Sequence, residues 1–156
     1  DMEGSRGLGD VYKRQECGPV LAKAAGLYMI CTLSKHEAEA KGYSDALMLD
    51  YRGQIAEATG ANIFFKMPDG KLHTPIADCF LDGITRRTVM KLAQDNGIEI
   101  IERKIMPEEM ADAEECFLTG TAAEVTPVQS IGDFKFKPGE YCLKLTKAYS
   151  DLVNGI

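Results

Sequence analysis

The stretch LDGITRRTVMKLAQDNG, residues 81–97, decides the fold class because it holds the clearest helix pattern in the chain. Val89, Leu92 and Ala93 recur at helical spacing, and Gly97 stands where a helix typically ends. The pattern predicts a helix over residues 85–96. Apolar segments precede and follow it, so we expect a helix that connects two strands.

Strands and helices alternate on both sides of this central helix. Strands are predicted at 46–49, 62–67, 71–74, 98–105, 116–118 and 125–131. Further helices are predicted at 27–41, from residue 107 onward, and near the end of the chain, where apolar residues recur at 145, 149 and 152. The expected buried face of the 27–41 helix comprises Leu27, Ile30, Leu33 and Ser34. Interleaved elements of this kind predict an α/β domain of the mixed α+β type.

Composition limits the classes of partner. The 156 residues suit one globular domain, with 45% hydrophobic and 27% charged residues. The net charge of −6 argues against a nucleic-acid-binding surface and against binding to an anionic membrane. No apolar run approaches the roughly 20 residues that span a bilayer. We therefore expect neither nucleic acid nor a membrane among the partners.

The cysteines and histidines do not form a ligand pattern. Five cysteines are widely spaced without a C-x-x-C pair, and His36 and His73 have no second ligand close by in the sequence. Zinc sites and disulfide frameworks show tighter patterns. We expect idle thiols in a reducing, cytoplasmic compartment, and no metal.

Residues 1–15 differ from the rest of the chain. Glycines interrupt any period, and DVYKRQ at 10–15 resembles the translated end of an adaptor used to prepare sequencing libraries. We predict a non-native or disordered leader over 1–15 and one domain over 16–156. A natural disordered N-terminus is the alternative.

Four short stretches could carry chemistry. Lys23 lies among alanines and a glycine, where desolvation would favour a neutral amine, and Glu57 lies among small residues. The segment 81–86 begins the central helix, whose free N–H groups suit a phosphate, and the turn 119–124 offers N–H and O–H donors to an anion. Taken singly, each has an ordinary alternative: a solvated charge, a helix capped by Thr85, or a plain strand-to-loop connection. Together they are the parts that a pyridoxal phosphate enzyme needs.

Five motifs occur in an order that resembles a known family. Residues from about Pro19 to Val153 are similar to the C-terminal large domain of the branched-chain aminotransferases, which are class-IV enzymes. The motifs are AKAAGLY (22–28), GYSDALMLD (42–50), EATGANIF (57–64), LDGITR (81–86) and GTAAEVTP (120–127). The resemblance implies the fold-type IV, D-amino acid aminotransferase-like fold and pyridoxal 5'-phosphate as cofactor.

The resemblance also implies roles for residues around the cofactor ring. Lys23 matches the lysine that binds the cofactor aldehyde covalently and later moves the substrate Cα proton. Tyr28 matches the tyrosine that hydrogen-bonds the phenolic oxygen, and Glu57 matches the carboxylate paired with the pyridine nitrogen. Leu81 matches the residue packed on the ring face.

Other matched residues imply two anion sites. Gly83 allows a ligand to approach the backbone, and Ile84 and Thr85 match the phosphate donors at the helix start. Thr121 matches a further phosphate contact that also borders the substrate. The backbone around Ala122 matches the site for the substrate α-carboxylate.

The implied activity is transamination of L-leucine, L-isoleucine or L-valine with 2-oxoglutarate, which gives branched 2-oxo acids and glutamate. Members of the family carry an N-terminal small domain, which supplies an arginine to the phosphate, and they assemble as dimers or larger homo-oligomers. This chain is expected to be a piece of such an enzyme that lacks the small domain. D-amino acid aminotransferase, aminodeoxychorismate lyase and a non-catalytic remnant domain remain as alternatives.

Overall fold

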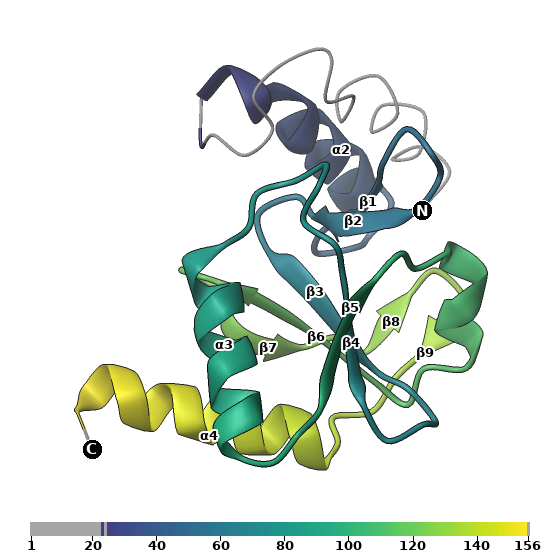
Figure 1. The fold of residues 1–156 in the computed structure, drawn as a ribbon. Helices are drawn as coiled ribbons and strands as arrows, with labels where there is room; N and C mark the ends of the chain where they lie inside the picture. Colours follow the sequence, from purple (N-terminus) through teal and green to yellow (C-terminus); the bar gives the residue numbers. More distant parts are fainter. Residues whose placement is uncertain (1–22, 24, 156) are drawn as a thin grey trace.

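A five-stranded sheet forms the centre of the chain in the computed structural model, which describes residues 23 and 25–155 (Figure 1). The strands lie in the order β5-β4-β3-β6-β7. Their bounds are β3 Asn62–Lys66, β4 Leu72–Pro75, β5 Ile100–Arg103, β6 Glu115–Gly120 and β7 Glu124–Pro127. Only β4 and β5 are paired in parallel, because the central helix connects them. The other neighbours are antiparallel.

Two helices pack on one face of this sheet (Figure 1). They are α3, Ile84–Asp95, and α4, Glu140–Asn154. Phe64 of β3 and Phe117 of β6 stack beneath them with ring centroids 5.1 Å apart. Val89 of α3 and Leu145 of α4 complete this apolar layer. The apolar spacing read from the sequence therefore identified the buried side of α3. For α4 it identified Leu145 and the partly buried Tyr149, whereas Leu152 is 55% exposed.

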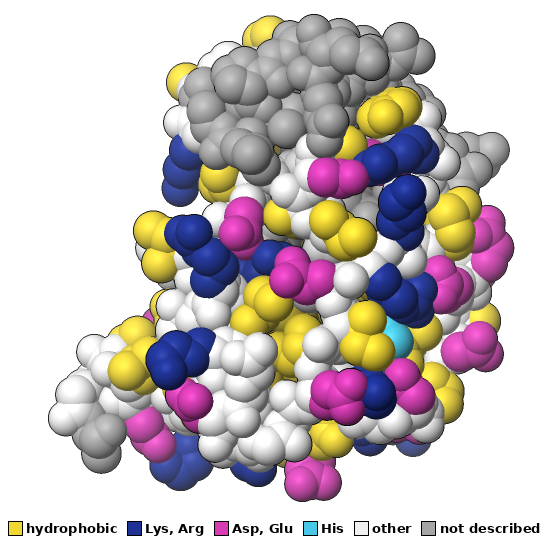
Figure 2. All heavy atoms as spheres, viewed as in Figure 1, with side chains coloured by type: hydrophobic (Ala, Val, Ile, Leu, Met, Phe, Trp, Pro, Cys, Tyr) yellow, Lys and Arg dark blue, Asp and Glu magenta, His cyan; other side chains and the backbone are white. Residues whose placement is uncertain are grey.

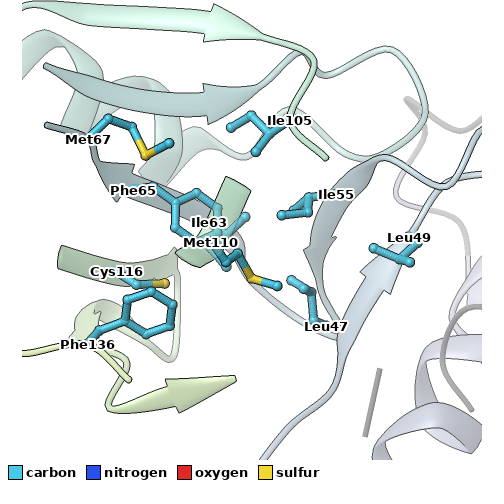
Figure 3. Close-up of a cluster of buried hydrophobic side chains, with 10 residues drawn as sticks. All are labelled: Leu47, Leu49, Ile55, Ile63, Phe65, Met67, Ile105, Met110, Cys116 and Phe136. Carbon is cyan, nitrogen blue, oxygen red and sulfur yellow. The ribbon is translucent and has the colours of Figure 1, made fainter. Parts of the chain in front are cut away.

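The opposite face of the sheet is covered by a second apolar cluster, shown in Figure 3. Ile63 and Phe65 point into it, so β3 is buried on both faces. Its cover consists of β1 Leu47–Leu49, β2 Ile55–Ala58, the short 3₁₀ helix η3 Pro107–Ala111, β8 Ser130–Ile131 and β9 Phe134–Lys135. The chain thus forms a mixed α/β structure with a layer on each side of the sheet.

The predicted strand at 125–131 is wrong in its extent. The structure divides it into β7 on the central sheet and β8, which pairs with β9 in a separate hairpin. The break follows Pro127, which has no N–H to donate to a ladder. The Val128 N–H still donates to the Cys116 carbonyl of β6 at 2.9 Å, and the chain leaves β6 after this bond. Val128 and Ile131 pack against the second apolar cluster.

The first helix buries only part of the face predicted for it. It begins with the 3₁₀ turn η2 Ala25–Leu27 and continues as α2 Met29–Ala40. Cys31, Ser34 and Ala38 are buried, whereas Leu33 is 54% exposed. Ser34 belongs to the predicted face and Ile30 is half-buried, so the prediction is wrong for Leu33 and incomplete at Cys31 and Ala38. The side chain of Leu27 and all of residues 1–15 lie outside the described residues.

A buried carboxylate joins β6 to the start of α4. Glu115 accepts hydrogen bonds from the backbone N–H groups of Cys142, at 2.9 Å, and Tyr141, at 3.3 Å. These are among the first N–H groups of α4, which lack acceptors within the helix. Gly139 precedes them, and a Cβ added there would lie 2.2 Å from the Glu115 carboxyl carbon. The cap therefore needs both the acid and the glycine.

We predict that Gly139→Ala lowers the free energy of unfolding by about 1–3 kcal/mol, the usual cost of overpacking. The φ angle of −117° is open to alanine, so the loss would come from displaced Glu115 and not from backbone strain. Urea unfolding measures it. Gly26→Ala is the control, because a Cβ there meets nothing within 4 Å. Equal midpoints for the two variants would contradict the proposed cap.

Charged side chains lie on the surface of the chain (Figure 2), and the described cysteines lie in its interior. Figure 2 shows basic and acidic side chains interspersed over the visible face. Among the described residues, four cysteines are buried, and desolvation raises the pKa of the Cys116 thiol well above its usual range. None of the helices that the structure describes could cross a membrane. Cys17 lies outside the described residues.

Candidate functional site

A cavity of about 560 Å³ opens beside the N-terminus of α3. The β2–β3 turn, the 81–85 segment and the end of β6 form its walls, and Lys23 and Tyr28 border it. Eight of the nine residues predicted from the sequence line it: Lys23, Tyr28, Glu57, Leu81, Gly83, Ile84, Thr85 and Thr121. Ala122 is exposed beyond Thr121 and is not among the lining residues. The fold therefore gathers four separate motifs into one site.

Glu57 supplies a carboxylate to the wall of the cavity. It lies on β2 opposite Met48 of β1 and is 8% exposed, so it is buried and not the solvated charge that the sequence left as the alternative. The next turn is tight, with the Ala58 N–H donating to the Ala61 carbonyl at 2.8 Å. The Thr59 hydroxyl in this turn donates to Asp45. These bonds fix the end of β2, and with it the carboxylate.

Tyr28 supplies a hydrogen-bond donor near that carboxylate. Its side chain is half-buried at the start of α2. Burial, and then the negative charge of Glu57, raise the pKa of the Tyr28 hydroxyl above its usual value. The hydroxyl therefore keeps its proton at neutral pH and can donate to an anionic oxygen.

Lys23 borders the cavity but is not enclosed as expected. Its side chain is exposed, and so are Ala25 and Gly26 beside it. Lys23 is nevertheless the only lysine among the described residues that line the cavity. It is thus the one amine in that lining that could react with a carbonyl group.

The segment 81–85 presents backbone donors to the cavity. Gly83, not Thr85, caps α3, and no side chain caps this end. Ile84 and Thr85 follow as the first residues of the helix, where N–H groups lack intrahelical acceptors. The positive end of the helix dipole adds to the attraction for an anion. Arg87, on the same turn, also lines the cavity and places a cation beside it.

The end of β6 provides the second polar turn. Thr119 is fully buried and lines the cavity, and its hydroxyl has no hydrogen-bond partner among the described residues. Thr121 follows and is exposed. Gly120 lies against the β2–β3 turn, where an added Cβ would be 3.2 Å from the Gly60 carbonyl oxygen. The start of α3 and the end of β6 therefore both present polar groups to one cavity.

Sequence reasoning gave no role to five polar residues of the lining: Thr59, Asn62, Asp82, Arg87 and Thr119. Asp82 lay inside the quoted LDGITR motif, and its carboxylate lies 4.0 Å from the Arg87 guanidinium. Asn62 and Thr119 carried a signal, since each is a polar residue within a largely apolar strand. Thr59 lay inside a quoted motif without a role. Arg87 stands on an exposed helix position and had no distinguishing signal.

A cluster of two aspartates and a cysteine lies apart from this cavity. Ligand atoms of Asp50, Asp78 and Cys79 come within 4.8 Å of one another. The Arg52 guanidinium bonds all three, with its Nη2 2.8 Å from Asp78, 2.6 Å from Asp50 and 3.1 Å from the Cys79 sulfur. These hydrogen bonds hold the pKa of Asp78 below its usual value. The positive charge offsets one of the two carboxylate charges, and the cluster joins the β1–β2 turn to the segment before Leu81.

Comparison with known proteins identifies the family. The model of the class IV amino-transferases matches residues 10–131, which is most of the chain. The chain therefore belongs to the class IV aminotransferase family.

The similar proteins are branched-chain aminotransferases. A probable branched-chain-amino-acid aminotransferase of Rickettsia conorii is 51% identical over 113 residues, which cover 72% of this chain and 39% of that protein. The branched-chain aminotransferase of Thermoproteus uzoniensis, solved with norvaline, superposes with a TM-score of 0.88 at 40% identity, over 91% of this chain and 48% of that one.

A further solved structure shows the cofactor-bound form. The branched-chain amino acid aminotransferase of Thermobaculum terrenum, in its PLP form, matches with a TM-score of 0.86 at 38% identity, over 91% of this chain and 48% of that one. The chain thus spans about half the length of the relatives it matches. The fold-type IV architecture expected from the motifs is confirmed.

Proposed function

We propose that this chain is the cofactor-binding part of a pyridoxal-phosphate-dependent branched-chain amino acid aminotransferase. One observation carries the proposal: a single cavity brings together Lys23, Glu57 and Tyr28 with the free N–H groups of α3. The similar proteins bear the same activity in their names, and one was solved with PLP. Pyridoxal phosphate, when bound, supplies an electron-accepting ring that makes the substrate Cα proton removable.

The polar lining fits the ring of that cofactor. Lys23 would bind the aldehyde and hold or move the proton at the substrate Cα. Glu57, enclosed on β2, would keep a proton on the ring nitrogen. Tyr28 keeps its own proton and would donate to the phenolic oxygen. Leu81 is half-buried in the wall and would pack on the ring.

The anion turns fit the phosphate and the substrate. The backbone at Gly83, Ile84 and Thr85 would bind the phosphate at the helix N-terminus, and Thr121 would add a donor from the second turn. The backbone near Ala122, just outside the cavity lining, would receive the substrate carboxylate. The buried Thr119 hydroxyl also lacks a hydrogen-bond partner among the described residues, so it could donate to a ligand in the cavity.

The substrates we propose are L-leucine, L-isoleucine and L-valine, with 2-oxoglutarate as the acceptor. The names of the relatives support branched-chain amino acids. We further propose that one domain extends over 16–156, and that an arginine for the phosphate comes from a small domain outside this chain. The buried, free thiols of Cys79, Cys116 and Cys142 support a reducing cytoplasm, and the family resemblance supports a homo-oligomer.

Borohydride trapping tests this proposal. The chain is titrated with PLP, reduced with borohydride, digested, and searched for a phosphopyridoxyl group on Lys23. The cofactor-loaded protein is then mixed with L-leucine or D-alanine, and pyridoxamine phosphate is quantified. Label on Lys23 and conversion by L-leucine support the proposal. Conversion by D-alanine alone indicates a D-amino acid aminotransferase, label without conversion indicates cofactor binding only, and no label contradicts the proposal.

A further inference from the structure

Asn62 lies at the corner between β2 and β3, against the segment expected to bind phosphate. It is the first residue of β3, 5% exposed, and lines the cavity. Its amide nitrogen donates to the Leu81 carbonyl at 2.9 Å. Its Oδ1 faces Gly83 so closely that a Cβ added to Gly83 would lie 2.4 Å from it. Both ends of one amide therefore contact the segment that leads into α3.

The same corner contacts the second polar turn. Asn62 pairs with Thr119 across the β3–β6 ladder. An added Cβ at Gly120 would lie 3.2 Å from the Gly60 carbonyl oxygen and 3.5 Å from the Ala61 Cβ. The corner 60–62 thus sets the spacing between the end of β6 and the N-terminus of α3.

Gly83 is required by this contact and not by its backbone angles. Its φ of −65° and ψ of 143° are open to any residue, and it caps α3 without help from a side chain. The Leu81 carbonyl is the point at which Asn62 holds this segment. The direction of the free N–H groups at the start of α3 therefore depends on the Asn62 amide.

We propose that Asn62 is a positioning residue that orients the α3 N-terminus toward the cofactor phosphate. This inference rests on the proposed function and adds to it a residue to which the motif comparison gave no role. Asn62 acts through Leu81 and Gly83. Its replacement should therefore weaken recognition of the phosphate more than recognition of the rest of the cofactor.

The test compares the dissociation constants of PLP and of pyridoxal, which lacks the phosphate, by absorbance titration. Asn62→Ala should lower the preference for PLP over pyridoxal by about tenfold, the effect of losing one hydrogen bond of about 1.4 kcal/mol. Asn62→Asp should lower it further, because the isosteric carboxylate repels the phosphate and cannot donate to Leu81. Asn96→Ala is the matched control. It removes an Asn-to-carbonyl bond of 2.8 Å to Leu92, at the other end of α3.

A second variant keeps the inference testable if Asn62 variants are less stable. Gly83→Ala should cost at least about tenfold in PLP affinity in the parent chain, and much less in the Asn62→Ala background, where the clash is removed. Circular dichroism confirms that each variant is folded at the temperature used.

Three results separate the possible outcomes. An unchanged preference in both Asn62 variants, or an equal change in Asn96→Ala, would overturn the inference while the proposed function stands. Additive effects of Gly83→Ala and Asn62→Ala would also overturn it. A parent chain that binds neither PLP nor pyridoxal would refute the proposed function itself.

Discussion

Lys23→Ala is expected to remove all borohydride-stable labelling of the chain by PLP and to lower any transamination rate by roughly 10⁴-fold. Lys23 is the only lysine in the described cavity lining, so no other amine there can take its place. One side chain serves both covalent attachment and proton transfer, which makes the expected loss large. Intact-mass spectrometry after reduction measures the labelling.

Lys35→Ala provides the matched control for this variant. Lys35 is an exposed residue of α2 and does not line the cavity. Its replacement should leave the labelling at one cofactor per chain. Non-covalent PLP affinity should also survive in Lys23→Ala, because the anion-binding backbone at Gly83–Thr85 is unchanged. Equal labelling of the Lys23→Ala variant and the parent would show that the reactive amine lies elsewhere.

Much of the architecture could be predicted because single patterns dominate it. The apolar spacing of α3 fixes its buried face, and Gly97, at φ 73°, ends it as expected. Pro127 was a signal for the end of β7, because it has no N–H to donate, but the sequence did not show that β8 pairs with β9 while Val128 and Ile131 pack against the second apolar cluster. For α2 the spacing named Ser34, which is buried, but it missed Cys31 and Ala38 and placed the exposed Leu33 on the buried face.

The residues of the site also differ in how far the sequence could identify them. Motifs in sequence order named eight lining residues, because each carries its own chemical signal. Asn62 was not recognised, since its importance lies in two contacts with Leu81 and Gly83, about 20 residues away. The exposure of Lys23 was also missed, because small neighbours can either bury a side chain or leave it uncovered.

Glu57→Gln is expected to lower the rate of Cα proton removal by about 10²–10³-fold, the usual cost of losing one preorganised electrostatic contact. Glutamine has nearly the shape of glutamate, so the buried wall of β2 should keep its packing. It has no charge, however, and cannot hold a proton on the ring nitrogen. Tritium exchange from the substrate Cα measures the step separately from binding.

The same substitution should change Tyr28 in a predictable direction. The charge of Glu57 helps to raise the pKa of the Tyr28 hydroxyl, so its removal should move that pKa back toward 10.0 while burial still holds it above that value. Carbon-13 labelling of tyrosine, with Tyr28→Phe to assign the signal, follows this titration by NMR. Glu99→Gln is the control, because Glu99 is an exposed partner of Lys71, outside the cavity lining. A loss of proton removal without any shift at Tyr28 would place the Glu57 charge away from Tyr28 and contradict the geometry of the site.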